Sequence, residues 1–288
     1  MELDNIIYPG FNKTLSELNA ISKIKKKSCE IVDLTEIEWV RDVLRHRVEE
    51  VGTYDIKFRK PTDEEIKSVS EIVGADINID ELKNNFHKNK RIIGITSGKG
   101  GVGKSTITSL LGIAFDELGK KVGIMDSDIW GYSVPKILGA KFPPIPFNER
   151  IFPSRINNLN VISMDYFVKQ DEAVIWRGPM LHKAIEQFLF EVLWHDIDVL
   201  LIDMPPGTGD VSISLSQFLK YFENIVVTTP QTNATIVAER SGIMSKKVNA
   251  SIIGVIENMS YMEAKGNKIY PFGKAVSYTH LRAHETQR

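Results

Sequence analysis

Residues 98–106 read Gly-Lys-Gly-Gly-Val-Gly-Lys-Ser-Thr, a glycine-rich stretch that fits the pattern G-x-x-x-x-G-K-[ST]. The stretch follows an apolar run, residues 92–95, which predicts a buried strand. It precedes residues 107–118, whose apolar side chains recur with helical spacing, and Gly119 predicts the end of that helix. A strand, a glycine-rich loop and a helix in this order form the unit from which we interpret the rest of the chain.

This loop has the chemistry of a phosphate-binding site. Glycines let backbone N–H groups turn toward a phosphate, and the helix that follows adds a partial charge of about +0.5 at its N-terminus. Lys104 is expected to contact the β- and γ-phosphates of a nucleotide, and the Ser105 hydroxyl to ligate Mg²⁺. The alternative is a glycine-rich turn without a ligand. The expected nucleotide-binding residues of the loop are Gly98, Lys99, Gly100, Gly101, Val102, Gly103, Lys104, Ser105 and Thr106.

The composition narrows the class of protein. A chain of 288 residues predicts one large domain or one domain with an appendage, and an apolar content of 42% suffices for a core. The net charge of −1 favours neither nucleic acid nor an anionic membrane as partner. No apolar run approaches the roughly 18 residues of a membrane span, and residues 1–4 lack a signal-peptide pattern. The single cysteine, Cys29, excludes an intrachain disulfide. These features predict a cytoplasmic protein.

The N-terminal part has a weaker pattern. Residues 1–60 are expected to form a small α/β domain, with a strand at 28–34, a helix at 37–51 and a strand at 54–58. Residues 61–90 are expected to form a linker that begins with a capping box and a short helix.

The remainder, residues 91–274, alternates between strand and helix patterns. This alternation predicts an α/β fold with a mostly parallel, doubly wound sheet. One of the expected helices covers residues 180–194. The expected strands are 92–96, 122–125, 161–163, 199–202, 225–229 and 252–256.

Two of these strands end in carboxylates. Asp126 and Asp128 follow one strand, and Asp203 ends another, in a Walker B arrangement. Ligands of open α/β sheets lie at the carboxyl ends of strands, so these side chains are expected near the phosphates. One carboxylate can orient an attacking water and another can support Mg²⁺. A surface turn is the alternative for residues 126–128. The glycine- and proline-rich loop 204–210 suits a segment that changes conformation when the γ-phosphate leaves.

Lys99 makes the motif more specific. The order Lys-Gly-Gly-x-Gly-Lys-Ser-Thr resembles the deviant Walker A loop of the MinD/ParA/nitrogenase-iron-protein class of dimeric ATPases. Within that class, the chain resembles the Mrp/ApbC family of iron–sulfur cluster carriers from about residue 91 to 274, and residues 1–60 resemble the small assembly domain that often precedes this ATPase. The segments that carry the resemblance are residues 125–131, 174–180, 205–210, 229–231 and 254–260.

The resemblance implies an ATP- and Mg²⁺-dependent homodimer. In it, Lys99 reaches the partner subunit's nucleotide, Asp128 positions the hydrolytic water and Asn258 contacts the adenine. The expected catalytic residues are Lys99, Lys104 and Asp128, and those expected to support Mg²⁺ are Ser105, Asp126 and Asp203. The expected partners are iron–sulfur scaffold or client apoproteins, with no nucleic acid and no membrane.

The chain departs from the family pattern in two places. Family members that carry clusters typically have a Cys-x-x-Cys pair shortly after the segment that ends at Ser260, whereas residues 261–268 contain no cysteine. The usual route of cluster binding therefore lacks its thiolate ligands in this segment, and Cys29 is interpreted as a packing residue. Residues 275–288 are expected to be a non-native tail, because their back-translation resembles a transposase-based sequencing adaptor.

These observations leave three hypotheses for the function. The first is an ATP-hydrolysing homodimer that acts in iron–sulfur cluster assembly as carrier or regulator. The second is a positioning ATPase of the ParA/MinD kind, which predicts a basic surface or an amphipathic helix. The third is a nucleotide-dependent reductase component, which needs cysteines that this chain lacks.

Overall fold

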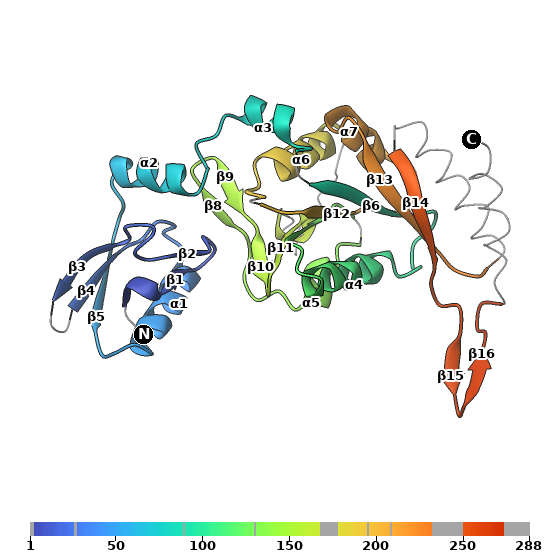
Figure 1. The fold of residues 1–288 in the computed structure, drawn as a ribbon, viewed down its shortest axis with the longest axis horizontal. Coiled ribbons are helices and arrows are strands. Elements are labelled where there is room, and N and C mark those ends of the chain that lie inside the picture. The colour runs from blue at the N-terminus through green and yellow to red at the C-terminus, as the bar shows by residue number, and fades with distance from the viewer. Residues whose placement is uncertain are drawn as a thin grey trace. The chain divides into compact units, whose positions relative to one another are not determined.

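We describe the fold from a computed structural model of the chain, shown in Figure 1. The description covers residues 3–25, 28–88, 90–129, 131–167, 178–194, 196–207, 209–231 and 250–273. The chain divides into two compact units. The first comprises residues 1–82, 143–154 and 191–193, and the second comprises residues 83–142, 155–190 and 194–288. The expected non-native tail, 275–288, and residues 174–177 of the resemblance lie outside the described residues.

The first unit contains a three-stranded sheet in the order β3-β4-β5, with β4 parallel to β5 and antiparallel to β3. The apolar face of α1 packs on it, because Val40, Leu44 and Val48 follow helical spacing and join Cys29 and Ile31 in one buried core. Cys29 is fully buried, in agreement with a packing role. The elements are η1 (Leu3–Asn5), β1 (Ile7–Tyr8), β2 (Lys13–Thr14), β3 (Ile21–Lys25), β4 (Ser28–Val32), α1 (Glu38–Glu49) and β5 (Asp55–Arg59).

Helix α2 (Asp63–Ile72) also belongs to the first unit, although residues 61–90 were expected to be a linker. The expected capping box is confirmed: Glu65 N donates to Thr62 Oγ1 at 3.2 Å, and Thr62 N donates to Glu65 Oε2 at 2.9 Å. Val69 and Val73 bury one face of the helix in the core of this unit. The chain then continues through α3 (Ile79–Asn85).

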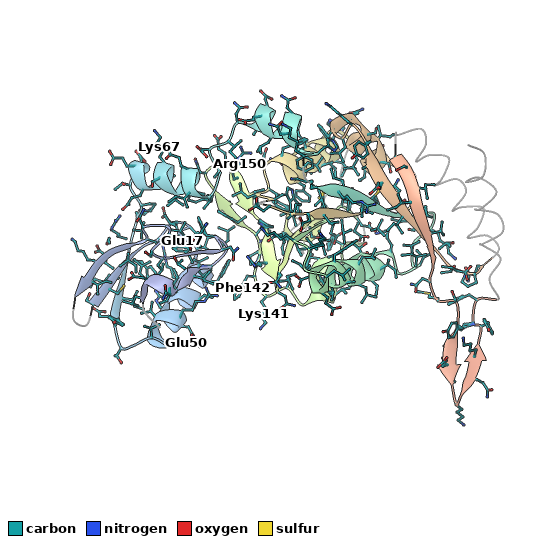
Figure 2. All side chains as sticks on the ribbon, in the orientation of Figure 1. Glu17, Glu50, Lys67, Lys141, Phe142 and Arg150 are labelled. Atoms are coloured by element: carbon teal, nitrogen blue, oxygen red, sulfur yellow. The ribbon has the colours of Figure 1, made fainter. Side chains whose placement is uncertain are left out.

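A hairpin from the middle of the chain completes the first unit. Strands β8 (Ile145–Phe147) and β9 (Arg150–Phe152) pair antiparallel, and Phe152 packs against Phe11 with ring centroids 4.3 Å apart. The buried Arg150, labelled in Figure 2, donates from Nε to the Ala75 carbonyl at 3.2 Å. The sequence pattern assigned this hairpin to the long segment 91–274. Its partners are non-local, so only the fold shows where it belongs.

The second unit is built on a seven-stranded sheet in the order β10-β11-β7-β12-β6-β13-β14. All neighbours from β11 to β14 pair parallel. Six of its strands are the six predicted ones, so the mostly parallel α/β fold is confirmed. Their bounds are β6 (Arg91–Ser97), β7 (Val122–Asp126), β10 (Ser154–Ile156), β11 (Leu159–Ser163), β12 (Val199–Asp203), β13 (Phe222–Thr228) and β14 (Ala250–Glu257).

Helices cover both faces of this sheet, as Figure 1 shows, with α4 and α5 on one face and α6 and α7 on the other. The strands between them are buried on both sides, so they read as continuous apolar runs. The bounds are α4 (Lys104–Glu117), α5 (Val134–Leu138), η2 (Met164–Phe167), α6 (Gly178–Phe190) and α7 (Asp210–Phe218).

After β14, the chain forms a hairpin of β15 (Met262–Ala264) and β16 (Asn267–Ile269). This hairpin occupies the segment in which the sequence pattern lacks the Cys-x-x-Cys pair. Most of its side chains are exposed. Among the described residues, no helix combines the length and the apolar character that a membrane crossing needs.

Candidate functional site

The glycine-rich loop joins the carboxyl end of β6 to the first residue of α4. Gly101 and Gly103 adopt φ of +76° and +85°, a left-handed conformation that side chains other than glycine rarely tolerate. The Ser97 hydroxyl donates to the Lys99 carbonyl at 3.0 Å, and Gly207 N donates to the Ser97 carbonyl at 2.8 Å. The sequence therefore forms a tight loop whose base is tied to the segment after β12.

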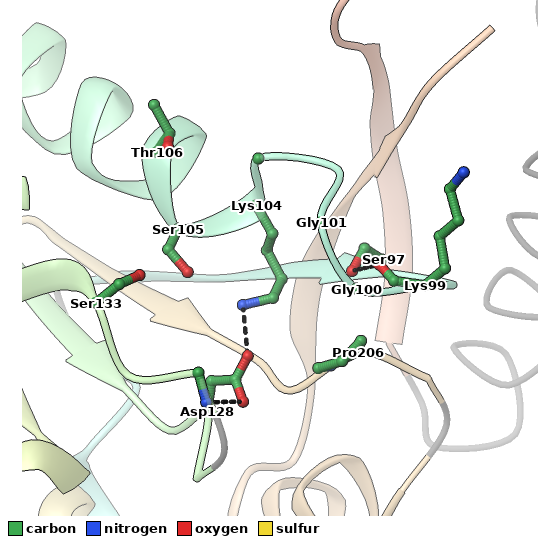
Figure 3. Close-up of a pocket in the computed structure, with 12 residues that line it drawn as sticks. Ser97, Lys99, Gly100, Gly101, Lys104, Ser105, Thr106, Asp128, Ser133 and Pro206 are labelled. Atoms are coloured by element: carbon green, nitrogen blue, oxygen red, sulfur yellow. Dashed lines mark hydrogen bonds and ion pairs between the residues drawn. The ribbon is translucent and has the colours of Figure 1, made fainter. Parts of the chain in front are cut away.

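This loop borders an open cavity of about 390 Å³, shown in Figure 3. Its other lining residues include Lys104, Asp128 and Pro206. A Cβ built on Gly100 or Gly101 meets nothing within 4 Å, so a ligand has free access to the loop backbone. A cradle of backbone N–H groups with a lysine at its base fits the phosphates of a nucleotide.

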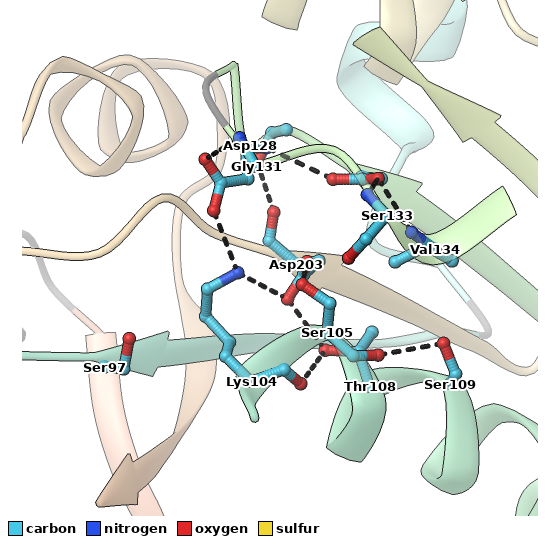
Figure 4. Close-up of polar contacts among 12 residues, drawn as sticks. Ser97, Lys104, Ser105, Thr108, Ser109, Asp128, Gly131, Ser133, Val134 and Asp203 are labelled. Carbon is cyan, nitrogen blue, oxygen red and sulfur yellow. Dashed lines mark hydrogen bonds and ion pairs between the residues drawn. The ribbon is translucent and has the colours of Figure 1, made fainter. Parts of the chain in front are cut away.

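Below the cavity, Asp203 accepts hydrogen bonds from three residues of α4, drawn in Figure 4. Lys104 Nζ lies 2.8 Å from Asp203 Oδ1 and Ser105 Oγ lies 2.6 Å from Oδ2. Thr108 Oγ1 lies 2.9 Å from Asp203 Oδ1. Asp203 is fully buried, and its carboxylate is compensated by this charged donor and two hydroxyls. The Walker B prediction therefore corresponds to a carboxylate in direct contact with the lysine and serine of the loop.

Asp128 is the second carboxylate beside Lys104. Its Oδ2 lies 3.4 Å from Lys104 Nζ, and its Oδ1 accepts a hydrogen bond from Gly131 N at 3.1 Å. Asp128 lines the cavity, whereas Asp203 does not. A carboxylate that is open to the cavity and held by its own loop can accept a hydrogen bond from a water placed there.

Asp126 lies at the end of β7, paired in register with Asp203. Its Oδ2 accepts hydrogen bonds from Ser163 Oγ at 3.0 Å and from the backbone N–H groups of Ser133 and Val134. Burial and the nearby charge of Asp203 raise the pKa of Asp126 to about 7. Asp126 does not line the cavity, so it acts on the loop 127–134 and on Asp203 in this arrangement.

The two residues whose roles came only from the resemblance have local partners. Lys99 Nζ donates to Gln231 Oε1, and Figure 3 shows its side chain leaving the loop away from Lys104. Asn258 Nδ2 donates to the Val102 carbonyl at 2.9 Å. Among the remaining loop residues, Val102 is buried and Thr106 lies at the edge of the cavity.

Three polar residues at this site were not singled out from the sequence. Thr108 lies four residues after Lys104, one helical turn along the same face, and this spacing was a usable signal. Ser163 ends β11 beside Asp126, a position visible only once the strand order is known. Gln231 was noted only as part of a motif.

Several known proteins are similar to this chain in sequence. An iron–sulfur cluster carrier protein of Mycobacterium leprae is 46% identical over 185 residues, which cover 64% of this chain and 48% of the relative. One from Aquifex aeolicus is 36% identical over 283 residues, covering 92% of this chain and 78% of the relative. The chain spans about half the length of the first curated relatives it matches.

A solved structure also matches. The nucleotide-binding protein from Archaeoglobus fulgidus, in complex with ADP, has a TM-score of 0.61 and 31% sequence identity, covering 73% of this chain and 84% of that one. The sequence pattern of one family, described as ParA, the NUBPL iron-transfer P-loop NTPases, matches residues 88–287. The fold, the loop and these matches agree: the chain belongs to the ParA/NUBPL family of iron-transfer P-loop NTPases.

Proposed function

We propose that this protein binds and hydrolyses ATP with Mg²⁺, as a cytoplasmic homodimer, in the service of iron–sulfur cluster transfer to apoproteins. One observation carries the nucleotide part of the proposal: a buried lysine, Lys104, lies between Asp203 and Asp128 beneath an open glycine loop. A buried ammonium beside a glycine loop with accessible N–H groups is suited to bind a polyanion.

Each residue has a role that follows from its position. Lys104 would contact phosphate oxygens with the amine that now contacts Asp203 and Asp128, and Ser105 would offer its hydroxyl to Mg²⁺. Bound Mg²⁺ supplies charge neutralisation at the phosphates. Asp203 would help to hold Mg²⁺, and Asp128 would orient the attacking water from its place in the cavity wall. Asp126 supports Mg²⁺ indirectly, through Asp203.

The course of Lys99 supports a homodimer. Its side chain points away from Lys104, as Figure 3 shows, and within the described part of the chain its amine donates to Gln231. From there, the amine is free to reach a nucleotide in a second copy of the chain once Gln231 releases it. In this proposal the two copies share their sites, and ATP controls how closely they associate.

The iron–sulfur part of the proposal rests on the names of the relatives and on the family. An iron–sulfur cluster would be cargo, and thiolates are its usual ligands. The one cysteine of this chain, Cys29, is fully buried in the first unit. Burial also raises the pKa of that thiol, which disfavours the thiolate that iron needs. We therefore favour a regulator of cluster transfer over a carrier that holds the cluster by a cysteine pair.

Hydrolysis is tested by phosphate release with Mg²⁺ and ATP. The wild-type chain is expected to release phosphate slowly. Asp128→Asn is expected to bind ATP with little change and to lose hydrolysis, because the amide no longer orients the water as a carboxylate does. Asp116→Asn, at the far end of α4, is the matched control and is expected to keep full activity. Absence of Mg²⁺-dependent phosphate release by the wild type refutes the enzymatic part of the proposal.

The role in cluster transfer needs a separate assay. A scaffold loaded with a cluster is mixed with an apoprotein, and transfer is followed with and without this chain and ATP. A regulator is expected to change the transfer rate with ATP while retaining no thiolate-bound cluster itself. A cluster that remains on the wild-type chain and is absent from Cys29→Ser favours the carrier alternative. No effect on transfer in any condition refutes both.

A further inference from the structure

Asn258, the residue after β14, is held at two points. Its backbone N–H donates to the carbonyl of Thr228, the last residue of β13, at 2.8 Å. Its side-chain Nδ2 donates to the carbonyl of Val102 in the glycine-rich loop at 2.9 Å. The residue therefore connects the loop to the carboxyl ends of two neighbouring strands of the sheet.

The loop also packs tightly against this side chain. A Cβ built on Gly103 lies 2.4 Å from Asn258 Nδ2 and 3.8 Å from Met259 Cε. The Val102 side chain is buried, at 2% exposed, so the loop has no room to rotate at this residue without unpacking it. Asn258 therefore contacts the loop both by a hydrogen bond to Val102 and by close packing against Gly103.

The geometry of the peptide unit gives this contact a consequence. The carbonyl of Val102 and the N–H of Gly103 belong to one planar trans peptide, so they point in opposite directions. When Asn258 holds the carbonyl on the sheet side, the N–H of Gly103 is directed away from Asn258. Gly103 lines the cavity, where a phosphate meets the N–H groups of the loop.

We propose that Asn258 is a positioning residue of the phosphate loop, which holds the Val102–Gly103 peptide so that the Gly103 N–H faces the phosphates. This role differs from the adenine contact that the resemblance implies, and it rests on the proposed binding of nucleotide. The proposed role of Asn258 concerns the phosphates, which ADP and pyrophosphate have in common. Loss of the amide therefore weakens the binding of ADP and of inorganic pyrophosphate by the same factor.

The test measures both affinities by calorimetry in the presence of Mg²⁺. Asn258→Leu keeps the branched shape and removes the donor, and it is expected to weaken ADP and pyrophosphate equally, by about 3- to 10-fold, the effect of one hydrogen bond. Asn258→Ser, which is too short to reach Val102, is expected to reproduce that equal loss. Ser260→Ala is the matched control. In the described part of the chain the Ser260 hydroxyl donates to Glu257 rather than to the loop, so its loss is expected to leave both affinities intact.

The possible outcomes separate the two roles. A loss of ADP affinity with unchanged pyrophosphate affinity overturns the positioning role in favour of a base contact. Unchanged affinity for both ligands in Asn258→Leu and Asn258→Ser also overturns it. If the wild-type chain binds neither ligand, the proposed function itself fails, and the positioning role fails with it. Circular dichroism of each variant verifies that the comparison is made on folded protein.

Discussion

Replacing Lys104 by methionine tests whether the nucleotide site also stabilises the protein without nucleotide. Methionine keeps the length of the side chain and removes its charge. In the structure, the Lys104 side chain is 6% exposed, and its amine compensates Asp203, which is fully buried, and Asp128, which is 9% exposed. After the replacement, the donors that remain to the Asp203 carboxylate among the described residues are the hydroxyls of Ser105 and Thr108.

The expected loss follows from this burial. Removing one partner of a buried ion pair costs about 3–5 kcal/mol, because the other charge stays in the interior without compensation. Asp128 lines the cavity, where water can replace the lost amine, so its contribution is small. We therefore expect a loss near the lower limit, about 3 kcal/mol. This corresponds to a roughly 150-fold increase in the rate of amide exchange for protons that exchange by opening of this unit.

Hydrogen–deuterium exchange of β6 and β12 measures this loss locally, without assuming that the two units unfold together. Adding Asp203→Asn to Lys104→Met removes the uncompensated charge. The double variant is expected to regain most of the protection from exchange without regaining nucleotide binding. Lys120→Met, an exposed position after α4, is expected to change stability by less than about 0.5 kcal/mol. If β6 and β12 of Lys104→Met exchange as slowly as in the wild type, the buried carboxylates do not need the Lys104 amine for stability, and the predicted loss is wrong.

Two further changes address other parts of the molecule. Because the pKa of Asp126 rises from 3.8 to about 7 on folding, the folded chain holds this proton between pH 4 and 7 while the unfolded chain releases it. Its contribution to stability therefore falls as pH rises through that window, by at most about 1.4 kcal/mol per pH unit. Without Mg²⁺, the melting temperature of Asp126→Asn is expected to fall less with rising pH than that of the wild type. An identical pH dependence of the two melting temperatures contradicts this assignment to Asp126. Thr62→Ala removes the cap of α2 and is expected to cost about 1 kcal/mol in urea unfolding, whereas Thr62→Ser retains it; equal losses in both exclude the capping bond as the cause.

Elements whose formation depends on residues close in sequence could be predicted from the sequence pattern. The glycine loop between an apolar run and a helical pattern predicted β6, the loop and α4, because a tight turn needs glycine and a buried parallel strand needs continuous apolar residues. The acidic ends of β7 and β12 predicted carboxylates beside the phosphate loop, since parallel strands share one carboxyl edge. The capping box of α2 likewise depends on residues only three apart.

Contacts between distant segments needed the fold. The hairpin 143–154 packs in the first unit although the chain around it forms the second, and no local pattern records which core will bury Phe147 and Phe152.

The phosphate loop and its acidic neighbours could be predicted from the sequence, because spacing along strands and helices sets them. That Asp126 accepts a hydrogen bond from Ser163, and that Asn258 reaches the Val102 carbonyl, became visible with the fold. The latter contact spans 156 residues, and it exists because β14 lies two strands from β6 in the parallel part of the sheet, so both strands end at the same edge. Strand order is a property of the whole packed sheet, so the partners it creates are not written in any one segment.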